Sequence, residues 1–177
     1  MDQKLVEFMK SQYPEDAWKY HITIVMKYAK YLAKIEHENV EVAELAALLH
    51  DIGGYRYGWD DHHKTGATEA EKILKDFGYD KKIISQVKEC VEAHSTSGFT
   101  IPKNKLITIM RDADALAHFD AVPWLLAIGL RNEKGHDAAV KWVADKLDRD
   151  YKNKLHLEES KKIAKEKYAA AKIILGK

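Results

Sequence analysis

Apolar residues recur at helical spacing along almost the whole chain, and no segment shows the strict alternation of a half-buried β-strand. Prolines and glycines, which interrupt helices, are sparse at 3 and 9 of the 177 residues. These patterns predict an all-α fold, a helical bundle. The predicted helices span about residues 15–34, 40–52, 65–77, 80–94, 104–130, 137–155 and 158–175.

Glycines and prolines mark the predicted connections. Gly53 and Gly54 are expected to end the second helix in the manner of left-handed C-terminal caps, and a loop should follow up to about Lys64. Gly78 should end the third helix, and Pro123 should kink the fifth. The remaining connections are predicted at about residues 95–103 and 132–136.

Composition narrows the class of protein. The length fits one domain, and the 46% of hydrophobic residues can form a packed core. The 29 basic and 28 acidic residues give a net charge of +1, which argues against a protein that coats extended nucleic acid or an anionic membrane. One cysteine excludes an internal disulfide, and the first ten residues lack the apolar core of a signal peptide.

The longest nearly continuous apolar run covers residues 121–130 and is too short to cross a bilayer. We therefore expect a cytoplasmic protein without a membrane partner. The same run is apolar enough to lie in the core or to form a homodimer contact, and the sequence does not choose between the two.

The dipeptide His50-Asp51 closes the second predicted helix. A helix C-terminus carries partial negative charge, so an aspartate there is unfavourable unless a cation compensates it. An imidazole beside a carboxylate offers that cation two ligands of the kind that divalent first-row metals accept. Taken alone, the pair could equally be a surface aspartate next to a histidine that contacts the helix end.

Three other segments also direct a histidine or an aspartate toward the interior. His21 extends the apolar stripe of the first helix, His94 extends that of the fourth, and Asp114 lies one turn after an apolar position of the fifth. Each could be a hydrogen-bonded core residue, whereas one shared metal centre would explain all of them, because an unpaired buried charge is costly. Periodicity does not choose between Asp114 and its neighbour Asp112.

The ordered set His21, His50-Asp51 and Asp114 resembles the HD-domain superfamily of metal-dependent phosphohydrolases. The resemblance covers roughly residues 20–116. Residues 48–53, Leu-Leu-His-Asp-Ile-Gly, are similar to the second motif of the family, and residues 113–116, Ala-Asp-Ala-Leu, look like its final motif, which selects Asp114 as the ligand. The resemblance implies one HD-type domain over residues 1–177, with a family-like core at about 15–130 and additional C-terminal helices at 137–175.

The resemblance also implies the metal ligands. His21, His50, Asp51 and Asp114 would hold one divalent ion. Many members with two metals carry a further histidine four residues before a small residue and another at a helix end, and His62 and His94 match these positions. These two would complete a second site with Asp51 as the bridge, and His63 is the alternative to His62. One or two ions are therefore expected, drawn from Fe, Mn, Co, Ni, Zn or Mg.

The implied substrate is a small phosphorylated molecule, most readily a nucleotide. Asp51 is the expected catalytic residue that orients the attacking water or bridges the metals, and Lys64 and Arg56 are the cations nearest in sequence for the phosphate, with Arg111 as a third option. The aromatic side chains within residues 55–59 could stack on a base, cover the site as a lid, or simply pack.

Several activities fit this resemblance. The leading one is a phosphohydrolase, whether a phosphatase, a phosphodiesterase or a dinucleoside-polyphosphate hydrolase. A second is an HD-fold di-iron oxygenase, since some such proteins carry six similar ligands. A third is a metal-binding regulatory module without turnover, and the least specific is a purely structural helical protein.

Overall fold

The computed structural model describes residues 1–95, 103–132 and 135–176, and within them it contains helices and no strand. The predicted all-α class is therefore confirmed. The predicted connections at 95–103 and 132–136 fall largely on residues 96–102 and 133–134, which lie outside the described residues. The helices are α1 (Gln3–Lys10), α2 (Glu15–Ala17), η1 (Trp18–Ile22), α3 (Thr23–Ile35), α4 (Val40–Leu49), α5 (Ile52–Tyr57), α6 (His62–Asp76), α7 (Lys81–Ala93), α8 (Lys105–Asp120), α9 (Val122–Asn132), α10 (His136–Arg149), η2 (Asp150–Lys154) and α11 (Glu158–Ile174).

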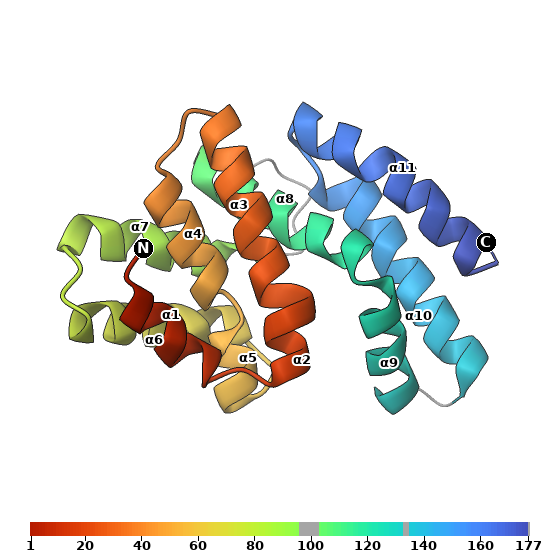
Figure 1. The fold of residues 1–177 in the computed structure, drawn as a ribbon, viewed down its shortest axis with the longest axis horizontal. Helices are drawn as coiled ribbons and strands as arrows, with labels where there is room; N and C mark the ends of the chain where they lie inside the picture. Colours follow the sequence, from red (N-terminus) through yellow and green to blue (C-terminus); the bar gives the residue numbers. More distant parts are fainter. Residues whose placement is uncertain (96–102, 133–134, 177) are drawn as a thin grey trace.

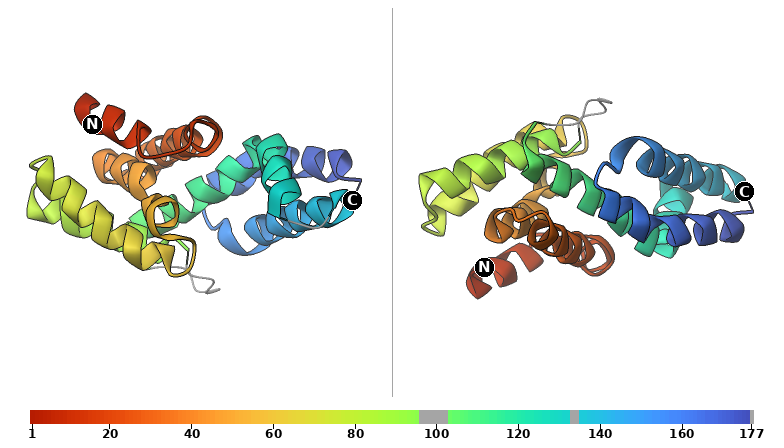
Figure 2. Two further views of the ribbon diagram at one scale, coloured as in Figure 1. Left: turned by 90° about the horizontal axis from the view of Figure 1, so that it is seen from below. Right: turned by 90° about the horizontal axis from the view of Figure 1, so that it is seen from above.

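Helix α8 runs through the middle of the molecule and joins two groups of helices (Figure 1). α1–α7 lie at one end and α9–α11 at the other, an arrangement that Figure 2 shows from two further sides. α3 packs on α4 and α8, α6 packs on α7, and α11 packs on α8. Because α8 is covered from both groups, every residue from Leu106 to Phe119 is buried.

The first predicted helix is present but is not uniform. After α2 the chain makes a π-helical stretch, η1, before it continues as α3. Such local widening is frequent at functional sites, because it changes the direction in which a side chain points without ending the helix. His21 lies in this stretch and is only 3% exposed.

The prediction that Gly53 and Gly54 end a helix is wrong. Both lie inside α5, and neither has a positive φ. A Cβ atom on Gly53 would lie 2.2 Å from the carbonyl oxygen of His62 and 2.4 Å from the backbone nitrogen of Gly66. Gly53 is therefore needed for the close approach of α5 to α6, and most of the predicted loop up to Lys64 is helical.

Other helix ends follow simple rules. Gly78 follows α6, whose end it was predicted to mark, and adopts a φ of +77°, the left-handed conformation of many helix C-caps. α1 was not predicted, although Asp2 caps it by accepting a hydrogen bond from the backbone N–H of Lys4. The predicted kink at Pro123 is an 85° bend between α8 and α9 with its break at Ala121.

Across the described residues we find no single helix with both the length and the apolar character needed to cross a membrane. The bent pair α8 and α9 meets those two criteria only when the helices are taken together.

Candidate metal centre

His50 and Asp51 lie at the junction of α4 and α5, deep in the molecule. His50 is fully buried, and its Nδ1 donates a hydrogen bond to the carbonyl oxygen of Ala47 at 2.8 Å. This contact with the preceding turn fixes the imidazole ring and directs Nε2 away from α4. Nε2 then lies 3.2 Å from Asp51 Oδ2 and 3.1 Å from the Nε2 atom of His21.

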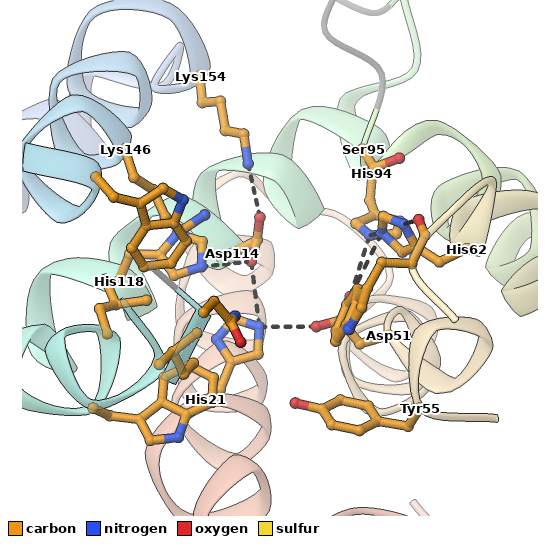
Figure 3. Close-up of a pocket in the computed structure, with 16 residues that line it drawn as sticks. His21, Asp51, Tyr55, His62, His94, Ser95, Asp114, His118, Lys146 and Lys154 are labelled. Carbon is orange, nitrogen blue, oxygen red and sulfur yellow. Dashed lines mark hydrogen bonds and ion pairs between the residues drawn. The ribbon is translucent and has the colours of Figure 1, made fainter. Parts of the chain in front are cut away.

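The first candidate set consists of His21, His50, Asp51 and Asp114, and it is assembled from η1, the α4–α5 junction and α8. Figure 3 shows three of its members, His21, Asp51 and Asp114. His21 Nε2 lies 3.3 Å from Asp51 Oδ2 and 3.4 Å from Asp114 Oδ1. All four residues are buried. Four side chains that are up to 93 positions apart in the sequence thus converge on one point.

The second candidate set faces the other oxygen of Asp51. Asp51 Oδ1 lies 3.8 Å from His62 Nε2 and 3.6 Å from His94 Nε2, and these two nitrogens are 3.3 Å apart. His62 is the first residue of α6, and His94 follows the last residue of α7. His63 contacts the ring of His62 but does not line the pocket.

The donor chemistry of these residues fits a bound cation. The Nδ1 atoms of His62 and His94 donate to the carbonyl oxygens of Trp59 at 2.9 Å and Val91 at 2.6 Å. In the neutral ring each Nε2 therefore carries a lone pair rather than a hydrogen. Two such lone pairs face each other beside a carboxylate oxygen, and a divalent ion between them would remove that repulsion.

The charges of the buried carboxylates and histidines in the cluster depend on one another. Burial disfavours the ionised form of both carboxylates, yet the pKa of Asp51 is held well below its usual range by His50 and His21, and that of Asp114 by Lys154 and the neighbouring histidines. Burial also opposes protonation of His50, but Asp51 and Asp114 outweigh it and raise the pKa of His50 to about 9. A proton on His50 therefore balances the carboxylates when no metal is bound.

Asp112 and Asp114 have different roles, which periodicity could not separate. Asp112 is fully buried and accepts hydrogen bonds from the backbone N–H groups of His156 at 3.0 Å and Leu157 at 2.9 Å. It thereby attaches the segment before α11 to α8, and its burial raises its pKa to about 6. Asp114 faces His21 and lines the pocket.

The cations singled out for the substrate lie elsewhere, and the third option, Arg111, donates a hydrogen bond to the carbonyl oxygen of Ala93 at 2.9 Å. Arg56 forms an ion pair with Glu69 and donates a hydrogen bond to Gln12 at 2.6 Å. The Lys64 side chain is 62% exposed and pairs with Asp61 at 3.0 Å. The structure places none of the three among the residues that line the pocket.

Two other lysines reach the pocket, and sequence reasoning missed them. Lys154 Nζ lies 3.0 Å from Asp114 Oδ2 and 3.4 Å from Asp150 Oδ1. Lys146 Nζ lies 3.9 Å from Asp150 Oδ2, and burial lowers the pKa of this amine. The spacing of four residues from 146 through 150 to 154 places these groups on one helical face, a signal that the sequence does contain.

His118 is a further residue that was missed. It lies one turn after Asp114, with its Nε2 3.6 Å from Asp114 Oδ1 and its Nδ1 2.8 Å from Asp150 Oδ2. Its ring stacks on His21 with 5.2 Å between centroids. Burial and the nearby Lys146 lower its pKa to about 4, so the imidazole is neutral near pH 7.

A pocket of about 390 Å³ lies beside the candidate ligands, and this volume is within the usual range for small-molecule sites. Tyr55 and Trp59 line one side, so two of the three aromatic residues singled out in the sequence face it. Tyr57 instead donates a hydrogen bond to Glu69 at 2.8 Å. The opposite side is formed by α9, α10 and η2.

Comparison with known proteins identifies the family. The family model of the HD domain matches residues 19–118, from the turn that holds His21 to His118. The chain belongs to the HD domain family. The helices beyond residue 118, including those that carry Lys146 and Lys154, lie outside the match.

Two solved structures share this HD fold over nearly the whole chain. The Lin1889 protein from Listeria innocua is 19% identical, with a TM-score of 0.73, and the alignment covers 98% of this chain and 90% of that one. A protein from an uncultured Thermotogales bacterium, described as a predicted HD superfamily hydrolase, is 23% identical, with a TM-score of 0.68 and coverage of 98% and 88%. No match was found among curated proteins.

Proposed function

We propose that the protein is a metal-dependent phosphohydrolase that acts on a small nucleotide or a related phosphoester. The observation that carries the proposal is the position of Asp51, whose two carboxylate oxygens face different sets of histidines. His21, His50 and Asp51, joined by Asp114 at 3.4 Å from His21, would hold one ion, and Asp51, His62 and His94 a second. Membership of the HD family and the description of the Thermotogales relative as a hydrolase support this assignment.

The bound ions would supply Lewis acidity, which acidifies water and polarises a phosphoryl oxygen. The chain itself supplies orientation and charge. The backbone carbonyls behind His50, His62 and His94 fix the three rings. Lys154 neutralises the oxygen of Asp114 that faces away from His21. Lysines beside the centre favour an anionic substrate, because phosphoryl transfer depends mainly on positioning and charge stabilisation.

The proposal is tested by metal content and by activity together. Purified protein supplied with manganese, iron, cobalt or magnesium should bind up to two ions and release phosphate or a mononucleotide from members of a broad phosphoester panel. His62→Ala should lose one of the two ions, whereas the adjacent His63→Ala should keep both. Inactivity on the whole panel with every metal would contradict the proposal.

The same ligand set would also suit two iron ions, which leaves the di-iron oxygenase as the competing activity. Iron-loaded protein in air separates the two. An oxygenase should consume oxygen when its substrate is added, whereas the proposed phosphohydrolase should hydrolyse phosphoesters equally well with or without oxygen.

A further inference from the structure

The pocket has a second side that the candidate ligands do not use. Helices α9 and α10, with η2, contribute Lys146, Lys154 and the indoles of Trp124 and Trp142 to its lining. Figure 3 shows Lys146 and Lys154 beside Asp114 and His118, across the pocket from His62 and His94. This side lies outside the HD-matched residues, and we call it the α9–α10 wall.

We infer that the α9–α10 wall is a recognition site for a nucleoside phosphate, in which the Lys146 ammonium binds a phosphate oxygen and the Trp142 indole contacts the nucleobase. This inference rests on the proposed phosphohydrolase function and specifies its substrate class.

Charge balance makes Lys146 the residue for the anion. Lys154 has the two shorter contacts, to Asp114 and Asp150, whereas Lys146 approaches Asp150 only to 3.9 Å. When cations are bound at the centre, they balance the negative charge of Asp114. One carboxylate, Asp150, then faces two lysines, and the excess positive charge on this side attracts an anion.

The packing of α9 on α10 fixes the position of Trp142. A Cβ atom on Gly129 would lie 3.2 Å from the Cβ of Ala139 and 3.3 Å from Cε3 of Trp142, so the two helices approach closely there. Trp142 is half-buried and lines the pocket together with Leu125 and Ile128. A planar ring held beside aliphatic side chains is the kind of surface on which a base packs.

Trp124 has a different role. Its ring stacks on His21 with 5.5 Å between centroids, and its Nε1 donates a hydrogen bond to Asp16 at 3.2 Å. It therefore holds a candidate metal ligand in place. On the other side of the pocket, Trp59 is 55% exposed and packs against Tyr55. Trp142 is therefore the indole of the enclosed wall that remains for the base.

The first experiment tests Lys146. Titration calorimetry would measure the binding of inorganic phosphate and of a nucleoside monophosphate to the manganese-loaded protein. Lys146→Met should weaken both by about tenfold to a hundredfold, the range expected for one hydrogen bond to a charged group. Lys146→Arg should restore part of the affinity. Lys141→Met, on the exposed face of the same helix, is the matched control and should bind as the wild type does.

The second experiment tests Trp142. Trp142→Leu should weaken the binding of the nucleoside monophosphate by about tenfold and leave the binding of inorganic phosphate unchanged, because stacking affects only the base. Tyr57→Leu, whose side chain lies outside the pocket and bonds to Glu69, is the control and should leave both affinities unchanged. Equal binding by Lys146→Met and the wild type, or a loss of base-dependent affinity in Trp59→Leu instead of Trp142→Leu, would overturn the inference.

Hydrolysis of p-nitrophenyl phosphate, which has no nucleobase, separates this inference from the function on which it rests. Wild-type protein that hydrolyses this ester but binds no nucleoside monophosphate would retain the proposed function and refute the nucleotide site. Wild-type protein that binds the nucleotide through Lys146 and Trp142 but hydrolyses no phosphoester would refute the proposed function and leave the nucleotide site standing.

Discussion

Asp51 contacts both halves of the candidate centre. Its Oδ2 atom faces His21 and His50, and its Oδ1 atom faces His62 and His94. A bridging position of this kind requires a carboxylate, because an amide offers only one oxygen and turns an N–H₂ group toward one of the two sets.

Asp51→Asn should therefore weaken the binding of both ions at once. We expect metal affinity and phosphoester hydrolysis to fall by at least about 10- to 100-fold, the range for loss of a partner that merely orients a ligand. Metal analysis after dialysis, together with the activity assay, measures this. Two ions retained at wild-type affinity would rule out a bridging role for Asp51.

Asp112→Asn is the matched control two residues from Asp114. It should keep both metals, since Asp112 bonds to the backbone N–H groups of His156 and Leu157. The amide group would leave one of these buried donors poorly satisfied, so the free energy of unfolding should fall by about 1–3 kcal/mol. Urea unfolding measures the loss.

The proton on His50 makes the stability of the metal-free protein depend on pH. Its pKa is about 9 in the folded chain, above the 6.5 of an ordinary histidine, so folding strengthens proton binding. The resulting stabilisation is fully present below about pH 6.5 and is lost as the pH rises through about 9. Urea unfolding with a chelator at pH 6.5 and pH 9 should show this loss, and His50→Gln should not.

At the scale of elements, the contact between α5 and α6 sets the position of His62. A Cβ on Gly53 would lie within 2.5 Å of backbone atoms of His62 and Gly66, which cannot move aside as a flexible side chain can. Gly53→Ala should therefore lower the free energy of unfolding by about 1–3 kcal/mol or more and weaken metal binding through His62.

Gly66→Ala serves as the comparison for Gly53→Ala, because its added Cβ would lie 3.3 Å from the carbonyl oxygen of His50 and 3.4 Å from the backbone nitrogen of Gly53. It should cost less stability than Gly53→Ala. Thermal unfolding of the two variants, with metal content measured in parallel, makes the comparison. If the two variants lose the same stability and the same metal content, the backbone contact at Gly53 does not set the position of His62.

Much of this fold could be predicted because helical periodicity is a local property. The long helices and the inward direction of His21, His94 and Asp114 follow from residues within a few turns. Gly53 was misjudged because its requirement comes from a contact with α6, which no pattern within its own segment records. The same limit explains Lys64, which is adjacent to a candidate ligand in sequence yet faces solvent.

The residues missed at the site show which information the resemblance did not carry. His118 is four residues after Asp114, so a helical projection alone would have placed it on the same face. The spacing of Lys146 from Asp150 and Lys154 places the three on one helical face but does not indicate that this face meets the centre. Lys146 reaches the pocket only because the chain turns by 85° after α8 and returns along α10.

At the scale of the whole molecule, the candidate centre connects parts that are distant in the chain. Its ligands come from η1, the α4–α5 junction, α6, the end of α7 and α8, and Lys154 links Asp114 to η2. The pocket therefore lies where the HD-matched helices meet the C-terminal ones. Ions at this place bind the folded chain and not the unfolded one, so they should stabilise the fold.

Metal should accordingly raise the temperature of unfolding in proportion to the logarithm of its free concentration. At a concentration 100 times the dissociation constant, each site should add about 2.7 kcal/mol. Thermal unfolding across a manganese titration would measure the rise, with chelator as the zero point. His94→Ala should remove the contribution of the second site and retain that of the first, because the Nε2 atom of His94 is directed to Asp51 Oδ1 and His62 Nε2. An unfolding temperature that does not respond to metal in the wild type would mean that the six side chains do not share bound ions.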